Sequence, residues 1–464
     1  MAIFEALRHS VNLALTVILA RLLNPSDFGL IGMAMILIGL LDSVSELGIK
    51  ASLVQKKESI KSYLDTAWTI QLFRGILLFL CLSLSAPIVA GFFREPMLNS
   101  IIPILALKPV VVGLNNPAAI NFVRELKFRK QFVLQISGVI LRLFLVIPLA
   151  FILRNVWVLV IGNLSVSGGT MITSYLMYPY RPRLSFDFKK GSEMFNFGKW
   201  LLGSQIIYII VRTVPSTIIG RLMDAASLGI YRIADQFGNL PAFILRQITN
   251  KVLFPAYTKL QEDKRRLRSG YDRVLNLVCG PVIPMSIGGF ILREPIVHHI
   301  LGSKWYDVAD PLGVLLLAGG VHLIVQTSFP LFMGMGHPKV IFLIRIASTT
   351  ALLVTIYPLF LIWGIEGVAF SVLISHSCAI PPWIYMLRRF IDFRILDICK
   401  TIGLTVAGTA LMAGIVLNFN SISEKSIVGL LSLVLIGIVI FNGFMFAMWK
   451  IFKIGPMKEL RSLL

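Results

Sequence analysis

Residues 18–31, ILARLLNPSDFGLI, join two apolar segments at a polar corner. Pro25 disfavours helical backbone at Asn24, so we expect the first helix to end there. Ser26 or Asp27 can then cap the amide groups that begin the second helix. The stretch therefore predicts a helical hairpin near the start of the chain.

The same corner recurs 200 positions later, in residues 218–231, which read IIGRLMDAASLGIY. Arg221 corresponds to Arg21 and Gly229 corresponds to Gly29, and the hydropathy of the flanking segments repeats as well. The repeat indicates a duplicated membrane protein with two related halves.

The composition is that of a membrane protein. Hydrophobic residues make up 56% of the 464 residues, and the mean hydropathy is +0.82, well above ordinary soluble usage. The apolar segments run for about 20 residues each, which lets a helix cross roughly 30 Å of hydrocarbon. We therefore expect an all-α polytopic membrane protein.

We expect about fourteen membrane-spanning helices, arranged as two related six-helix lobes followed by two further helices. The predicted domains are an N-terminal lobe at 1–180, a cytoplasmic surface linker at 181–199, a C-terminal lobe at 200–390, and helices 13 and 14 with a cytoplasmic tail at 391–464. The expected spans are 4–23, 28–49, 67–92, 100–122, 132–153, 156–178, 200–222, 228–252, 274–300, 311–333, 340–363, 364–387, 398–417 and 427–449.

The net charge of +21 could suggest nucleic-acid binding, but the basic residues fall mainly in alternate connecting segments, such as 123–130 and 251–273. That distribution reports membrane topology and, by the positive-inside rule, places both termini in the cytoplasm. We therefore expect membrane lipids, and no nucleic acid, among the partners.

Motifs of soluble enzymes are absent from the sequence. The four cysteines have no metal-ligand spacing, and there is no phosphate-binding loop, HExxH, CxxC or GxSxG. We expect no cofactor, no metal and no enzymatic activity.

Among the basic residues inside the expected spans, five stand out because of their depth. A cation at mid-membrane costs at least ~2.5 kcal/mol, so these residues should share an aqueous cavity or pair with anions. Acidic residues are fewer there, and a net positive cavity suits an anionic substrate. Arg74 and Arg345 could instead extend to the cytoplasmic interface. The candidate substrate-binding residues are Arg142, Arg212, Lys108, Arg74 and Arg345.

Three acidic residues in the spans, Asp42, Glu46 and Asp235, are candidates for ion coupling. Asp42 and Glu46 share one helical face at four-residue spacing. Pairing with a neighbouring arginine, or capping the inner end of the helix, is the alternative for both. His322 and His376 also lie within spans, where we expect packed polar residues rather than a proton relay.

The corner carries a family resemblance. Residues 19–34, LARLLNPSDFGLIGMA, resemble the first-hairpin signature of the bacterial polysaccharide exporters and O-antigen flippases. These are the lipopolysaccharide, colanic-acid and teichuronic-acid exporters of the multidrug/oligosaccharidyl-lipid/polysaccharide superfamily. Residues 250–263, NKVLFPAYTKLQED, are similar to that group's stretch after the eighth helix. The resemblance implies two six-helix lobes in a V around a central cavity that opens alternately to either side.

The function implied by this resemblance is transport for surface polysaccharide biosynthesis. The chain is expected to be a flippase that moves an undecaprenyl-diphosphate-linked oligosaccharide from the cytoplasmic to the outer leaflet of the bacterial inner membrane, with the glycan polymerase machinery as a further partner.

Three alternatives stay open: a drug/cation antiporter of the same fold, a membrane enzyme of glycan assembly, and a scaffold. The antiporter should favour acidic cavity residues. The enzyme should have a long external loop, whereas the largest expected outer loop, 302–310, is short.

Overall fold

The computed structural model describes residues 2–45, 53, 60–125, 127–188, 212–241, 253–254, 256–419 and 426–452. These residues form helices joined by short turns, with no strand among them. The chain divides into two compact units, Met1–Arg232 and Ile233–Leu464. The domain boundaries expected from the sequence stay a prediction, because 189–211 lie outside the described residues.

The first corner forms where its sequence predicts, with Asn24 rather than Ser26 or Asp27 as the N-cap residue. Helix α1 (Ala2–Leu22) ends just before Asn24, and α2 (Pro25–Val44) begins at the proline. The Asp27 carboxylate accepts a hydrogen bond of 3.0 Å from the Asn24 amide. Pro25 has no amide proton to satisfy in the first helical turn, so the residue that ends one helix also starts the next.

The second corner has the same local structure. A helix over 212–222 precedes α11 (Ala225–Gly238), and Asp224 caps α11 by accepting a hydrogen bond of 2.7 Å from the Ser227 amide. The two corners use equivalent positions with the donor and acceptor roles exchanged, since the carboxylate is residue 27 in one and residue 224 in the other.

The two corners also pack directly on each other. A methyl group on Gly29 would lie 1.6 Å from the Ala225 carbonyl oxygen, and one on Gly229 would lie 1.9 Å from the Pro25 carbonyl oxygen. Glycine is needed at both positions because the two backbones touch. Position 25 corresponds to 225 and position 29 to 229, so the contacts are reciprocal.

The fourth expected span is not one continuous helix. The chain forms α5 (Leu98–Leu105), α6 (Leu107–Gly113), η1 (Pro117–Ile120) and α7 (Asn121–Arg124), with a bend of 69° after Gly113. Proline disfavours helical backbone at the residue before it, and Pro117 follows the bend. The span expected over 100–122 therefore consists of short helices that bend after Gly113.

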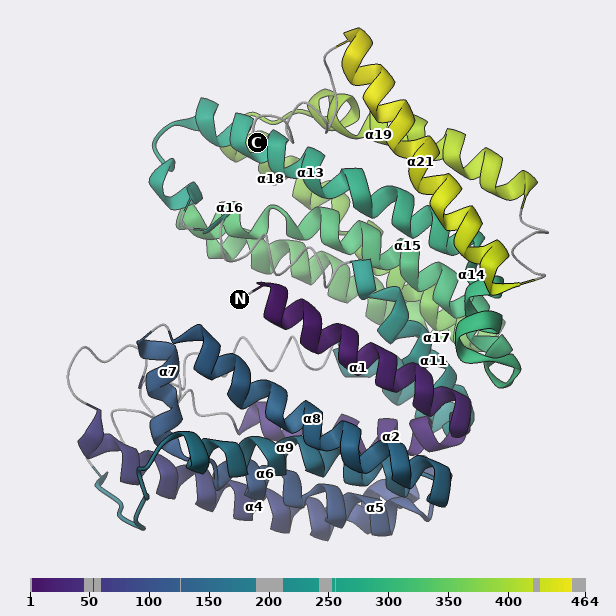
Figure 1. Ribbon diagram of the computed structural model, residues 1–464. Helices are drawn as coiled ribbons and strands as arrows, with labels where there is room; N and C mark the ends of the chain where they lie inside the picture. The colour runs from purple at the N-terminus through teal and green to yellow at the C-terminus, as the bar shows by residue number, and fades with distance from the viewer. Residues whose placement is uncertain are drawn as a thin grey trace. The chain divides into compact units, whose positions relative to one another are not determined.

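The other long helices of the first unit are α4 (Lys61–Phe93), α8 (Phe128–Leu153) and α9 (Trp157–Met177). Helices α8 and α9 lie side by side (Figure 1). Gly138 and Gly169 allow this approach, because a methyl group on Gly138 would lie 2.3 Å from the Val166 carbonyl oxygen.

Residues 178–188, which we call the strap, follow α9 and run along the start of α4. The Asp65 carboxylate accepts hydrogen bonds from the Tyr180 hydroxyl, 2.7 Å, and the Arg183 amide, 2.8 Å. The Thr69 hydroxyl oxygen accepts one from the Ser185 amide. Burial, followed by the hydrogen bond and charge of Asp65, raises the pKa of Tyr180 to about 12, which keeps this phenol a proton donor.

In the second unit, α13 (Lys264–Ile291) begins ten residues before the expected span. The Asp263 side chain accepts hydrogen bonds of 3.0 Å from the amides of Arg265 and Arg266, and so caps the helix. Leu267 and Tyr271 are buried in the first turns. The basic KRRLR sequence is therefore the start of a packed helix.

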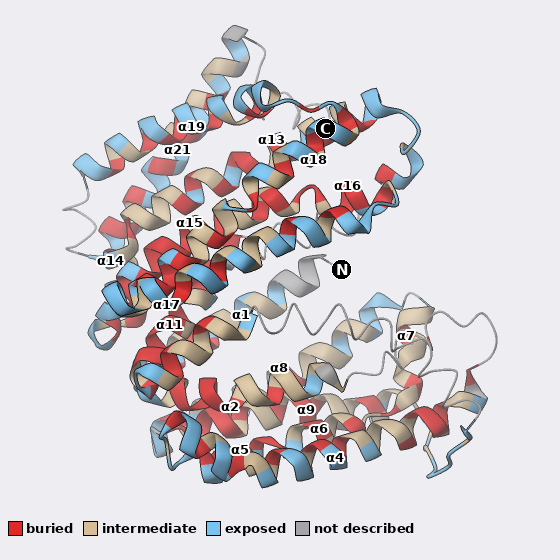
Figure 2. Ribbon diagram, turned by 180° about the vertical axis from the view of Figure 1, so that it is seen from behind, coloured by how far each residue is buried: buried red, intermediate tan, exposed pale blue. Residues whose placement is uncertain are grey.

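Three short helices separate α13 from the next long helix, α15. They are α14 (Arg293–Ile296), η2 (Val297–Leu301) and η3 (Ser303–Val308), and they lead to α15 (Ala309–Gln326) and α16 (Phe329–Gly334). Most residues of α15 are buried, as the colouring by burial shows (Figure 2).

Helix α17 (Pro338–Ser377) reverses direction at Gly364, where φ is +56°. A methyl group on Gly367 would lie 1.9 Å from the Leu359 carbonyl oxygen, so the two halves form a tight helical hairpin. The expected boundary between the eleventh and twelfth spans, at residues 363 and 364, is confirmed. Helix α18 (Ile380–Ile391) continues the second half.

The last two long helices are α19 (Ile395–Asn418) and α21 (Ile427–Phe452). Along α21, Leu433 is fully buried while Val428 and Val439 are about 70% exposed. Exposed apolar residues are ordinary on a helix whose outer face contacts lipid. The pattern agrees with the expected pair of C-terminal spans.

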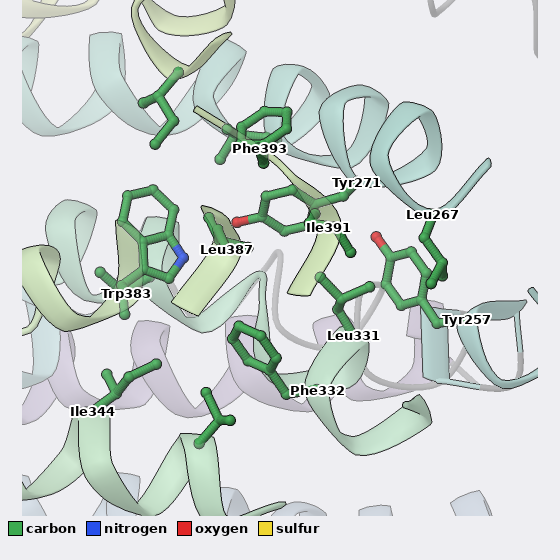
Figure 3. Packing of buried hydrophobic residues seen from close by; sticks show 14 of the residues in the cluster. Tyr257, Leu267, Tyr271, Leu331, Phe332, Ile344, Trp383, Leu387, Ile391 and Phe393 are labelled. Atoms are coloured by element: carbon green, nitrogen blue, oxygen red, sulfur yellow. The ribbon is translucent and has the colours of Figure 1, made fainter. Parts of the chain in front are cut away.

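A cluster of aromatic and aliphatic side chains holds α13, α16, α17 and α18 together. Tyr271 packs edge to face on Phe393, with ring centroids 5.4 Å apart, and Trp383 and Phe332 lie in the same cluster (Figure 3). The buried Tyr271 hydroxyl shares a hydrogen bond of 3.1 Å with Thr327. This cluster fixes one end of α15, next to His322.

Among the described residues, nine helices are long and apolar enough to cross a membrane, or ten if the bent pair 98–113 and 117–124 counts as one span. One of the nine, 338–391, contains two of the expected spans. Large parts of the seventh and eighth spans lie outside the described residues. The chain is thus an all-α polytopic membrane protein, and a total of fourteen spans is consistent with the structure.

Candidate functional site

The first unit brings together three of the five candidate cations. Arg74 lies on α4, Lys108 on α6 and Arg142 on α8, and both Arg142 and the Asp42 carboxylate on α2 interact electrostatically with Lys108. We call these four residues the cationic cluster. Its charges come from four separate helices, so only the folded bundle can assemble it.

Arg74 is the paired member of the cationic cluster. Its guanidinium forms an ion pair with the Asp42 carboxylate and donates to the Asp42 carbonyl oxygen at 2.8 Å and to the Ser45 hydroxyl at 3.0 Å. Asp42 therefore neutralises a neighbouring arginine, which is the alternative to a coupling ion that its sequence position left open.

Arg142 is the member whose charge has no carboxylate against it in the described contacts. Its Nη1 donates to the Asn12 side-chain oxygen at 3.3 Å, and its buried Nε has no hydrogen-bond partner among the residues that the structure describes. The absence of a side chain at Gly162 makes room for it, because a methyl group there would lie 3.2 Å from Nε. A buried guanidinium with unused donors is suited to an anionic ligand.

The other two candidate cations lie outside the cationic cluster. Arg212 is exposed at the start of the helix over 212–222 in the first unit. Arg345 lies in the second unit, on the first half of α17, where its guanidinium is 5.6 Å from the centre of the Phe329 ring. The structure thus assembles three candidates, and the role of all five in binding substrate stays a prediction.

The remaining ion-coupling candidates have different outcomes. Glu46 lies outside the described residues. Asp235, on α11, is half-buried and accepts a hydrogen bond of 2.8 Å from the Asn239 side chain. Coupling through Asp42, Glu46 or Asp235 stays a prediction.

The neutral residues of these sites could not be predicted from the sequence. Asn12 looks like an ordinary polar residue of a membrane helix, and nothing in the sequence places it beside Arg142. The close packing of His322 on His376 was also missed, because the two rings come from different spans. A repeat or a charge can be read from sequence, but a pairing of helices cannot.

The sequence matches a known family over most of its length. A model of the polysaccharide biosynthesis protein family covers residues 18–310, more than half of the chain.

Individual relatives include the lipopolysaccharide biosynthesis protein WzxC of Escherichia coli (strain K12), 26% identical over 65% of this chain and 62% of that protein. The teichuronic acid biosynthesis protein TuaB of Bacillus subtilis (strain 168) is 23% identical over 64% of this chain and 62% of that protein. The succinoglycan biosynthesis transport protein ExoT of Rhizobium meliloti (strain 1021) is 26% identical over 72% and 68%. The matched part of this chain spans less than two thirds of the length of WzxC and TuaB.

Solved structures show the same architecture. The lipid II flippase MurJ, in an inward closed conformation, has a TM-score of 0.79, with 97% of this chain and 98% of that chain covered at 13% identity. An inward-facing multidrug resistance MATE family transporter of the MOP superfamily has a TM-score of 0.60, with 83% and 95% covered at 15% identity. At this identity the likeness concerns the fold. The chain belongs to the polysaccharide biosynthesis protein family and has the fold of these membrane transporters.

Proposed function

We propose that the chain is a flippase for surface polysaccharide biosynthesis. It moves an undecaprenyl-diphosphate-linked oligosaccharide from the cytoplasmic to the outer leaflet of the bacterial inner membrane by alternating access. No chemical bond is made or broken. Membership of the polysaccharide biosynthesis family supports the substrate class, and ExoT is a relative whose name describes transport.

The observation that carries the proposal is the cationic cluster. Three cations and one carboxylate lie among membrane-spanning helices, where an unpaired cation is costly. The net positive charge favours a diphosphate, whose oxygens can accept a hydrogen bond from the Nε–H that Arg142 leaves unused. We propose that Lys108, Arg74, Arg212 and Arg345 also contact the substrate's phosphates or acidic sugars.

The main alternative, a drug/cation antiporter, is disfavoured by the same cluster. A site for cations needs an excess of carboxylates, and the single carboxylate here is already paired with Arg74. A membrane enzyme is disfavoured by the segment expected to be the longest outer loop. Residues 303–308 form a short helix in which Trp305 is fully buried, so this segment is part of the packed fold.

We further propose that both termini face the cytoplasm and that the glycan polymerase machinery acts next to this chain. The end of α7, the turn after it and the start of α8 carry Arg124, Lys127, Arg129 and Lys130, whereas the opposite ends of α4 and α8 carry the single residues Arg94 and Arg154. That asymmetry supports a cytoplasmic position for the α7–α8 turn.

The test is complementation of a flippase-null strain by the wild-type chain and by Arg142→Ala, with matched expression. The wild type should restore surface polysaccharide, and Arg142→Ala should reduce it at least about tenfold, since losing a charge-assisted hydrogen bond costs about 1.5–3 kcal/mol. Arg129→Ala, at the exposed start of α8, is the matched control and should restore polysaccharide fully. Equal restoration by Arg142→Ala and Arg129→Ala would rule out a substrate role for the cluster.

A further inference from the structure

The second unit contains a pair of stacked histidines. His322 on α15 and His376 on the second half of α17 have ring centroids 4.1 Å apart and planes inclined by only 28°. Both rings line a small cavity together with Arg345. The remaining lining residues are Val325, Phe329, Ile344, Ser348 and Ala379.

The polar groups in and next to this cavity are mostly hydrogen-bond donors. The Ser348 hydroxyl donates to the Arg345 carbonyl oxygen, and the Ser375 hydroxyl donates to the Ser348 carbonyl oxygen. These hydroxyls are thus directed at the backbone, while the Arg345 guanidinium lies against the face of the Phe329 ring. A guanidinium beside two imidazoles is a suitable set of donors for an oxyanion.

His322 can change its protonation state without losing its neighbour. Its Nε2 lies 2.6 Å from the Gln326 side-chain amide. A neutral His322 accepts a hydrogen bond from the amide nitrogen, and a protonated His322 donates to the amide oxygen once the Gln326 side chain turns over. Gln326 therefore accommodates both states.

The charges around the pair oppose protonation while the cavity holds no anion. Two imidazolium rings at this separation repel each other, and Arg345 adds a third positive charge. The carboxylates on two helices packed near α15 are engaged elsewhere, because Asp235 on α11 accepts from Asn239 and Asp272 on α13 accepts from Thr401.

Two further groups on these helices are paired with their own neighbours rather than with the rings. Tyr271 bonds Thr327, and Arg293 of α14 pairs with Asp310 at the far end of α15. An anion entering the cavity would place negative charge next to the rings, and its arrival favours the protonated form of one of them.

We propose that His322, Arg345 and His376 bind a phosphate-type oxyanion, and that the histidine pair takes up one proton as the anion enters. The proposal rests on the proposed function, in which the diphosphate of the transported lipid is the ligand. An anionic phospholipid headgroup has the same chemistry and is distinguished by experiment.

The test is calorimetric titration of the purified full-length chain with inorganic pyrophosphate near pH 7, in two buffers of different ionisation enthalpy. The difference between the two heats gives the number of protons taken up with each anion. The wild type should take up between about half a proton and one proton per anion. His376→Gln and His322→Gln should bind pyrophosphate with no net proton uptake, and Arg345→Gln should bind about 10- to 100-fold more weakly.

His298→Gln is the matched control, because His298 lies in η2, outside the cavity, and this variant should keep the full proton uptake. A wild type that does not bind pyrophosphate would overturn the proposal, as would unchanged uptake in both histidine variants. Either variant alone suffices if the other fails to fold.

The source of the anion is decided by repeating the titration in nanodiscs of phosphatidylcholine with and without phosphatidylglycerol. Unchanged pyrophosphate affinity in the anionic discs supports the transported diphosphate as the ligand. Competition by phosphatidylglycerol would assign the site to a headgroup and overturn the link to transport. The titration requires no transport, so its failure is distinct from failure of the complementation experiment.

Discussion

Gly29 and Gly229 lie against each other although 200 residues separate them, since a methyl group on Gly229 would come within 3.1 Å of the Gly29 nitrogen. The same group would lie 1.9 Å from the Pro25 carbonyl oxygen, and Gly29 approaches Ala225 in the matching way. Each copy of the repeated corner thus forms the packing surface of the other. This shared packing requires the same small residue at the equivalent position of both copies.

Gly29→Ala should destabilise the chain. The added methyl group has no room and should cost about 1–3 kcal/mol, the usual range for overpacking. Thermal unfolding in detergent measures this as a lower midpoint. Gly39→Ala on the same helix is the control, because no atom lies within 4 Å of the new methyl group and alanine favours helix by roughly 0.5–1 kcal/mol. Equal midpoints for the two variants would refute the close crossing.

Glu95 makes the stability of the fold depend on pH in a direction that follows from its pKa. Burial, and then the charge of Asp224, raise its pKa, although the Ala225 amide donates to it. A carboxyl whose pKa is raised by folding contributes stability at low pH that is lost as pH rises through the folded-state pKa. Glu95→Gln removes the repulsion and should raise the unfolding midpoint at pH 7, with the gain disappearing near pH 4.

Glu125→Gln is the control, because it should shift the unfolding midpoint in the opposite direction. The hydrogen bond and charge of Lys127 lower the pKa of Glu125, so its contribution is present at neutral pH and lost on acidification. The unfolding midpoint of this variant should therefore be slightly lower than that of the wild type at pH 7. At low pH the two midpoints should be equal. If both variants shift the midpoint in the same direction, the assignment of these charges is wrong.

Tyr271→Phe should lower stability by about 1 kcal/mol, because it removes the buried hydrogen bond to Thr327. Tyr257→Phe is matched in chemistry and burial, but the Tyr257 hydroxyl has no hydrogen-bond partner among the described residues. That variant should be neutral or stabilising. Chemical unfolding of the two variants side by side measures the difference, and a larger loss for Tyr257→Phe would contradict the packing shown in Figure 3.

The Arg74–Asp42 pair can be measured by a double-mutant cycle. Arg74→Ala, Asp42→Ala and the double variant should show a coupling of about 1 kcal/mol, because the pair is only partly buried. Unfolding midpoints of the four proteins provide the cycle. Additive effects would mean that Asp42 does not neutralise Arg74. Asp42 would then be available to bind a coupling ion.

The features predicted correctly from the sequence are those that depend on residues close together in the chain. Pro25 and Asp27 define the first corner, and the apolar segment lengths define most helices. The break before Gly364 was also predicted correctly. Each depends on backbone preferences or periodicity that neighbouring residues determine by themselves.

The features that were missed depend on packing. The start of α13 was placed too late, because the KRRLR sequence looks like a loop until Leu267 and Tyr271 are seen to be buried. The bend before Pro117 could not be told from the tolerated prolines of other spans. Arg142 was found by its depth, but its partner Asn12 lies on a helix that is 130 residues away in sequence.

The division of the chain after Arg232 has a consequence for synthesis. The first compact unit includes the beginning of α11. The second corner must therefore be synthesised before that unit can fold completely. Until then the face of α2 that carries Gly29 lacks the backbone of the second corner against which it packs. Truncated chains that stop before residue 225 should therefore be recognised as incomplete by membrane proteases, whereas chains that pass Arg232 carry every residue of the first unit.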